Sequence, residues 1–178
     1  MRTSWLITAA VATVLTVSIT SCMSGGKMKG MKPPFGGPED TARASRLWSR
    51  ISGYRSWQSY PGLSGFQEGR SPHGKFLKYY INSTAARNLT APGSIIVKEN
   101  FMAKDNAMLG AVTVMEKVPG YDPDNGDWFW VKFAGNGSVM KNKMGMSLAG
   151  RVAKGMKKGC IACHGNAGGG DFLFINDQ

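Results

Sequence analysis

The sequence predicts an α+β domain, a mainly antiparallel β-sheet with flanking helices. Three observations indicate this fold class. Strand-like segments rich in aromatic and β-branched residues follow one another between residues 75 and 133, a helix-like segment precedes them, and a stretch with helical spacing follows them. The connections between the strand-like segments are short, which favours antiparallel pairing, because parallel neighbours need crossovers of about a dozen residues or more.

The N-terminal residues 1–21 of this 178-residue chain are typical of a signal peptide of the lipoprotein type. Arg2 precedes an apolar run over residues 5–19, which is shorter than the roughly 20 residues that span a bilayer. Residues 19–22 (ITSC) resemble a bacterial lipobox, in which the cysteine is acylated and becomes the new N-terminus. We therefore predict an exported protein on the periplasmic side of a bacterial membrane, lipid-anchored through Cys22. An ordinary signal followed by an unrelated cysteine is the alternative.

Residues 22–40 are rich in Gly, Pro and Lys and contain almost no bulky apolar side chains. Such a segment buries too little surface to offset its ordering entropy, so we expect a flexible membrane tether there. Residues 41–178 are then expected to form a single domain of ordinary size.

The formal net charge of the chain is +11. A basic balance is common in nucleic-acid-binding proteins, but an exported lipoprotein does not meet nucleic acid, so we expect no such partner. The basic tether can lie on anionic lipid headgroups. A basic domain surface can dock an acidic redox partner protein, because complementary charge speeds encounter. A surface that is merely soluble is equally compatible with this charge.

The first predicted element is a helix at residues 39–51, where Leu47, Trp48 and Ile51 lie about one turn apart. Residues 52–74 have the Gly, Pro and Ser density of a loop. Strands are then predicted at residues 75–82, 93–101, 108–118 and 127–133, with one helical turn within residues 83–92.

The pattern changes after Ser138. Apolar residues recur there at four-residue steps, which predicts a helix that runs up to the two C-terminal cysteines. These residues are Met140, Met144, Leu148 and Val152. Residues 168–175 (GGGDFLFI) are apolar enough at their end to predict a last strand.

The chemistry of the chain centres on the motif CIACH at residues 160–164. Two thiols three positions apart on a helical turn can form thioethers with the two vinyl groups of haem, and the adjacent histidine then supplies the axial nitrogen. A zinc site usually needs four ligands. Beyond this motif and the predicted lipid-anchor residue Cys22, the only other histidine or cysteine of the sequence is His73. A thioredoxin-like redox pair belongs to an α/β fold. The motif therefore predicts one haem c, covalent through Cys160 and Cys163, with His164 on the iron.

Three motifs in this order resemble the cytochrome P-460 family, which includes the cytochrome c′-beta proteins. They are APGSIIVKENF at 91–101, MEKVPGYDPDNGDWFWVKF at 115–133 and GCIACHGNAGGGDFLF at 159–174. The resemblance covers roughly residues 55 to 176. It implies a mainly antiparallel sheet, one haem c that is commonly five-coordinate, and often a homodimer. It also implies one of two chemistries: hydroxylamine oxidation with a lysine joined to the haem edge, or binding of NO or CO under a phenylalanine cap.

The resemblance places the crosslinking lysine of the family at Lys98. Strand alternation puts Lys98 on one face of its segment with Ile96, and Glu99 on the other face with apolar residues. Lys98 can therefore approach haem, where a partly desolvated amine is a better nucleophile than a solvated ammonium. An exposed strand lysine is the alternative. If the face of Glu99 is the core, Glu99 needs a partner there.

The chain departs from the hydroxylamine oxidisers on the distal side. The resemblance implies a carboxylate there to take protons from substrate, but this chain reads Ala111-Val112-Thr113, and the nearest acid is Glu116. His73 falls about where relatives have a distal phenylalanine. It can be a sixth iron ligand, a hydrogen-bond partner of bound ligand, or an ordinary loop histidine. The candidates for an apolar distal cap are Phe66, Phe76 and Phe101.

Three functions are compatible with this sequence. The first is a membrane-tethered mono-haem cytochrome that binds NO or a related small nitrogen species at haem iron. The second is an electron-transfer cytochrome with six-coordinate haem, and the third is a hydroxylamine oxidase with Lys98 crosslinked. Basic residues near the motif suit an acidic redox partner or are simply a solvated face. They are Arg151, Lys154, Lys157 and Lys158.

Overall fold

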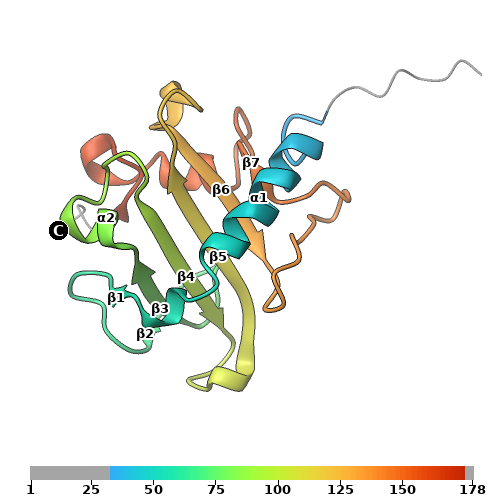
Figure 1. Cartoon of the computed structure of the whole chain (residues 1–178). Helices are drawn as coiled ribbons and strands as arrows, with labels where there is room; N and C mark the ends of the chain where they lie inside the picture. Colours follow the sequence, from blue (N-terminus) through green and yellow to red (C-terminus); the bar gives the residue numbers. More distant parts are fainter. Residues whose placement is uncertain (1–32, 175–178) are drawn as a thin grey trace, which may run out of the picture. The chain divides into compact units, whose positions relative to one another are not determined.

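The computed structural model describes residues 33–174, which form one antiparallel sheet with helical segments on both of its faces (Figure 1). Within this range the sheet has seven strands in the order β1-β3-β4-β5-β6-β7, and β2 also pairs with β3. The strands are β1 (Gln58–Ser59), β2 (Gln67–Glu68), β3 (Phe76–Ile81), β4 (Ile95–Phe101), β5 (Leu109–Lys117), β6 (Trp128–Phe133) and β7 (Ala149–Gly150). The predicted fold class is confirmed, and so are the four predicted strands, which are β3 to β6.

Three α-helices lie in the described range. They are α1 (Pro38–Arg50), α2 (Ser83–Arg87) and α3 (Cys160–His164). Single turns of 3₁₀-helix are η1 (Tyr54–Ser56), η2 (Asn106–Met108), η3 (Pro123–Asn125) and η4 (Gly168–Gly170). The helix predicted at 39–51 is confirmed as α1, and the predicted helical turn is α2. No helix among residues 33–174 is long and apolar enough to cross a membrane.

The folded part begins before residue 41. Phe35 is buried, and Pro38 is the first residue of α1. The predicted signal peptide, Cys22 and most of the expected tether lie outside the described residues.

The helix predicted after Ser138 is wrong. The chain from Ser138 to Gly159 forms turns, an antiparallel bridge between Lys141 and Ser147, and the short strand β7. Glycines interrupt the helical spacing, because they adopt positive φ angles that a right-handed helix does not contain. They are Gly145, Gly150, Gly155 and Gly159. The last strand is also wrong for the described residues 168–174, which contain η4 and no strand.

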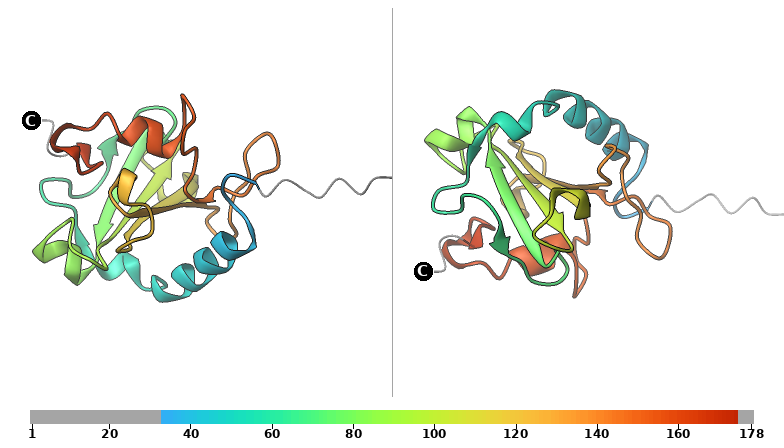
Figure 2. Two further views of the ribbon diagram at one scale, coloured as in Figure 1. Left: turned by 90° about the horizontal axis from the view of Figure 1, so that it is seen from above. Right: turned by 90° about the horizontal axis from the view of Figure 1, so that it is seen from below.

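The sheet separates two layers. Figure 2 shows α1 along one face and the C-terminal segment, in red, along the other. Alternation within β4 assigns its side chains to these layers: Ile95 and Val97 pack in the core with α1, whereas Ile96 packs with Ile161 of α3. Lys98 falls on the same face as Ile96 and Glu99 on the face of α1, as the sequence predicts.

Two buried carboxylates bind the helical layer to the sheet. Glu99 accepts hydrogen bonds from the hydroxyl groups of Tyr54 (2.6 Å) and Tyr80 (3.1 Å) and from Arg55 (2.7 Å). Glu116 of β5 accepts from two arginines of α1, at 2.8 and 2.5 Å. A buried carboxylate needs such partners to offset its lost hydration, so the partner expected for Glu99 is present.

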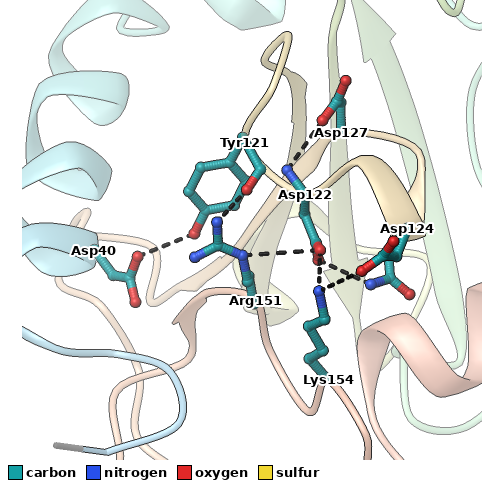
Figure 3. Close-up of polar contacts among 8 residues, drawn as sticks. Asp40, Tyr121, Asp122, Asp124, Asp127, Arg151 and Lys154 are labelled. Carbon is teal, nitrogen blue, oxygen red and sulfur yellow. Dashed lines mark hydrogen bonds and ion pairs between the residues drawn. The ribbon is translucent and has the colours of Figure 1, made fainter.

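A third buried carboxylate, Asp122, fixes the segment that leads to α3 (Figure 3). Its side chain is fully buried and accepts from Lys154 (Nζ–Oδ1, 2.5 Å) and from Asn125 (Nδ2–Oδ2, 3.0 Å), with Arg151 Nε at 3.8 Å. The hydrogen bond to Asp122 raises the pKa of Lys154 above its ordinary value. Arg151 also donates to the carbonyl oxygen of Tyr121. These contacts hold the chain before α3 against the turn between β5 and β6.

Removal of the Asp122 carboxylate is predicted to destabilise the fold. Asp122→Ala leaves Lys154 and Asn125 without their buried acceptor and should lower the free energy of unfolding by about 1–3 kcal/mol. Asp124→Ala is the matched control, since Asp124 also binds Lys154 but its side chain is 84% exposed; its effect should stay within about 0.5 kcal/mol. Denaturant unfolding of both variants measures this. Equal losses would contradict the role given to Asp122.

Candidate haem site

Helix α3 presents both cysteines and the adjacent histidine to one side of the sheet. Its turn is closed by backbone hydrogen bonds from Cys163 to the carbonyl oxygen of Gly159 (2.9 Å) and from Gly165 to that of Ile161 (2.8 Å). Gly159 has a φ of 134°, and a Cβ there would lie 2.2 Å from the Cβ of Ala153. Glycine is therefore required directly before Cys160 for the chain to enter the helix so close to its neighbour.

Two adjoining cavities lie between α3 and the sheet. The first has a volume of about 210 Å³ and is lined by both cysteines, His164, and residues of β4, β5 and β6. The second, of about 420 Å³, is lined by aromatic and apolar residues that include Tyr60, Tyr79 and Phe174. Ile96, Lys98, Met115 and His164 border both cavities. The space is mainly apolar, and the two cavities share these four lining side chains.

His164 is oriented as a metal ligand. Its Nδ1 lies 2.8 Å from the carbonyl oxygen of Phe172, and because a carbonyl only accepts, Nδ1 carries the proton. The lone pair is then on Nε2, the arrangement in which a backbone carbonyl orients a ligating histidine. Burial lowers the pKa of His164 to about 4, so the ring is neutral at pH 7. The Trp130 ring lies against it, with ring centres 4.8 Å apart.

A second histidine, His73, also lines the first cavity. Its Nδ1 is 2.9 Å from Asn100 Oδ1. The Asn100 amide is oriented by its other end, where Nδ2 donates to the carbonyl oxygens of Lys98 (3.0 Å) and Ala111 (3.1 Å). Asn100 therefore presents an acceptor, and His73 Nδ1 carries the proton. Burial lowers the pKa of His73 to about 3. The ring centres of the two histidines are 6.3 Å apart.

The polar groups at the cavity walls include two lysines and an indole donor. Lys98 and Lys132 both line the first cavity, and burial lowers the pKa of Lys98 to about 8. The Lys98 ammonium lies 5.3 Å from the centre of the Tyr79 ring. Trp130 Nε1 is buried and has no hydrogen-bond partner among the described residues. No Asp or Glu is among the residues of 33–174 that line either cavity.

These residues fit a haem c. Cys160 and Cys163 line the cavity into which the macrocycle would extend, and His164 Nε2 can bind its iron. The apolar walls suit the porphyrin, while Lys98, Lys132 and the unpartnered Trp130 donor suit its two carboxylates. Burial raises the pKa of Cys160 to about 11, so its thiol is protonated before a thioether to haem forms. When bound, haem would supply a redox-active iron that can also bind small ligands.

The structure gathers five of the six predicted site residues around the first cavity: His73, Lys98, Cys160, Cys163 and His164. The sixth, Cys22, lies outside the described residues. Cys160 and Cys163 are not joined in a disulfide.

Several other candidates lie elsewhere. Glu116 is bound by arginines of α1 on the opposite face of the sheet, so it does not reach the cavity, and Thr113 lines the wall instead. Phe66 and Phe101 pack against each other, with ring centres 5.0 Å apart. Among the described residues, neither they nor Phe76 are part of the lining of the two cavities.

Three residues of the site were not predicted from the sequence. Trp130 and Lys132 could have been found, because strand alternation places both on the same face of β6. Strand alternation also places Asn100 on the face of Lys98, but its hydrogen bond to His73 joins residues 27 positions apart, for which the sequence has no local signal.

The sequence matches the family model of cytochrome P460 over residues 51–175. No curated protein matches the chain. The matched range contains every residue of the cavity walls named above, including the CIACH motif, and the family implies a c-type haem. This chain belongs to the cytochrome P460 family.

Proposed function

We propose that this protein is a membrane-tethered, mono-haem c-type cytochrome on the periplasmic side of a bacterial membrane, whose iron binds NO or a related small nitrogen species. One observation carries the proposal: a single cavity collects two thiols and a histidine whose Nε2 is available for iron. The lipid anchor at Cys22 and export rest on the N-terminal sequence alone.

The cavity walls favour binding of a small neutral ligand over oxidation of hydroxylamine. Oxidation of hydroxylamine releases protons, which a positioned base has to accept. The described lining of the first cavity contains no carboxylate; its polar side chains include Thr113, two lysines and His73. Burial lowers the pKa of His73 to about 3, which makes it a weak base. NO needs no proton transfer to bind, so such a wall is sufficient for it.

An electron-transfer cytochrome with six-coordinate haem is the second candidate. The position of His73 favours it, because its ring centre lies 6.3 Å from that of His164. A docking surface for an acidic redox partner would rely on Lys157 and Lys158, which are exposed and directly precede Gly159. Arg151 and Lys154 contribute less, because both interact with Asp122.

Both cysteines are predicted to hold the haem. The double variant Cys160→Ala, Cys163→Ala should lose all haem that survives denaturing electrophoresis, whereas each single variant should keep one thioether. The pyridine haemochrome spectrum of a single variant should shift, because one vinyl group stays conjugated with the ring. Haem that remains covalent in the double variant would contradict the assignment.

The wild-type protein is predicted to bind NO and not to oxidise hydroxylamine. Addition of NO to the ferrous protein should change its Soret band, while hydroxylamine with an artificial electron acceptor should give no turnover, because the cavity lacks a carboxylate base. Visible absorption and acceptor reduction measure the two reactions. Sustained hydroxylamine-dependent reduction of the acceptor would reverse the order of the candidates.

Lys98 is predicted to approach the haem without a covalent link. Wild type and Lys98→Arg should then share the absorption spectrum of an ordinary c-type haem, since the cation is retained and no bond is lost. A strongly red-shifted ferrous Soret band in the wild type that returns to the ordinary position in Lys98→Arg would instead show a crosslink.

A further inference from the structure

We propose that His73 is the sixth ligand of the iron in the resting protein, so that the haem is held between two histidines and a small ligand must displace His73. This inference rests on the proposed haem attachment. Neither the family nor the CIACH motif requires it.

The spacing of the two rings is the first argument. Both rings line the first cavity, and their centres are 6.3 Å apart. An iron atom bound at about 2 Å by each of two facing imidazole nitrogens holds the ring centres roughly 6 Å apart. The observed 6.3 Å matches this value, whereas a diatomic ligand between the iron and His73 would require a larger separation.

The hydrogen bonds of the two rings are the second argument. Each ring donates from Nδ1 to an oxygen that is fixed by the fold: the Phe172 carbonyl for His164 and Asn100 Oδ1 for His73. Both rings therefore keep the lone pair on Nε2. A histidine that only filled a loop would not need this orientation, whereas a ligating histidine does.

The loop between β2 and β3 holds His73 in place. Gly74 lies so close to β4 that a Cβ there would be 2.3 Å from the carbonyl oxygen of Phe101. The backbone amide of His73 donates to the carbonyl oxygen of Arg70 (2.9 Å). His73 is nevertheless carried by a loop and not by a strand, so a local change of that loop or of the side chain can release the iron.

Two other residues at the cavity offer donor atoms. The Lys98 amine and the Met115 thioether both border the cavities on the sheet side. Among the described ring contacts of His164, however, the partner that can also bind iron is His73; the others are Trp130 and Phe174. Lys98→Arg and Met115→Leu are therefore the matched controls.

The experiment is visible and electron paramagnetic resonance spectroscopy of the full-length ferric holoprotein and its variants. Wild type, Lys98→Arg and Met115→Leu should be low-spin. His73→Ala should be high-spin, and free imidazole should restore its low-spin spectrum, which shows that the variant has kept its fold. The planes of the two rings are 89° apart. Perpendicular planes leave two iron d orbitals nearly degenerate, so the wild type should give a highly anisotropic low-spin signal with a single prominent low-field feature.

NO binding gives a second readout. If His73 occupies the iron in about nine molecules of ten or more, His73→Ala should bind NO with about tenfold or greater apparent affinity, because the competent fraction no longer limits binding. A high-spin wild type, or a low-spin His73→Ala without added imidazole, would overturn the inference while leaving the haem attachment in place. A wild-type protein without covalent haem would overturn the proposed function and this inference together.

Discussion

The hydrogen bond from His164 Nδ1 to the carbonyl oxygen of Phe172 is the interaction on which the site depends. It fixes the proton on Nδ1 and leaves Nε2 as the only ring atom that can bind a metal. The bond joins the CIACH helix to the chain eight positions later, so the segment after α3 orients the ring that α3 carries. The thiols, the cavity and the second histidine are useful to an iron only because this ring is so oriented.

The sheet makes this arrangement possible because its two faces are buried in different chemical environments. On the α1 face, Glu99 and Glu116 are held by tyrosines and arginines, which stabilises the attachment of the helix. On the opposite face, the described cavity lining has cations and neutral groups but no carboxylate. Neighbouring residues of one strand, Lys98 and Glu99, thus belong to different environments. A shift of β4 by one residue would exchange them, and the register is fixed by the apolar residues on both faces.

The strands and the CIACH motif were predictable because their signals are local. Alternation in β4 was sufficient to place Lys98 toward the cavity and Glu99 toward the core. The helix predicted after Ser138 is wrong for a reason also visible in the sequence: the apolar residues recur at four-residue steps, but Gly145 and Gly150 lie between them and adopt positive φ angles that a right-handed helix does not contain. The meeting of His73 with His164 could only be suggested by resemblance, because 90 intervening residues fold before the two rings face each other.

The measurement that tests the central claim most directly is the mass of the tryptic peptide that follows Lys158. Trypsin should release a peptide that begins at Gly159 and contains both cysteines and His164. The account predicts that this peptide carries the mass of one haem and absorbs in the Soret region. A peptide of unmodified mass with two free thiols, together with haem that is extracted by acidified organic solvent, would contradict it.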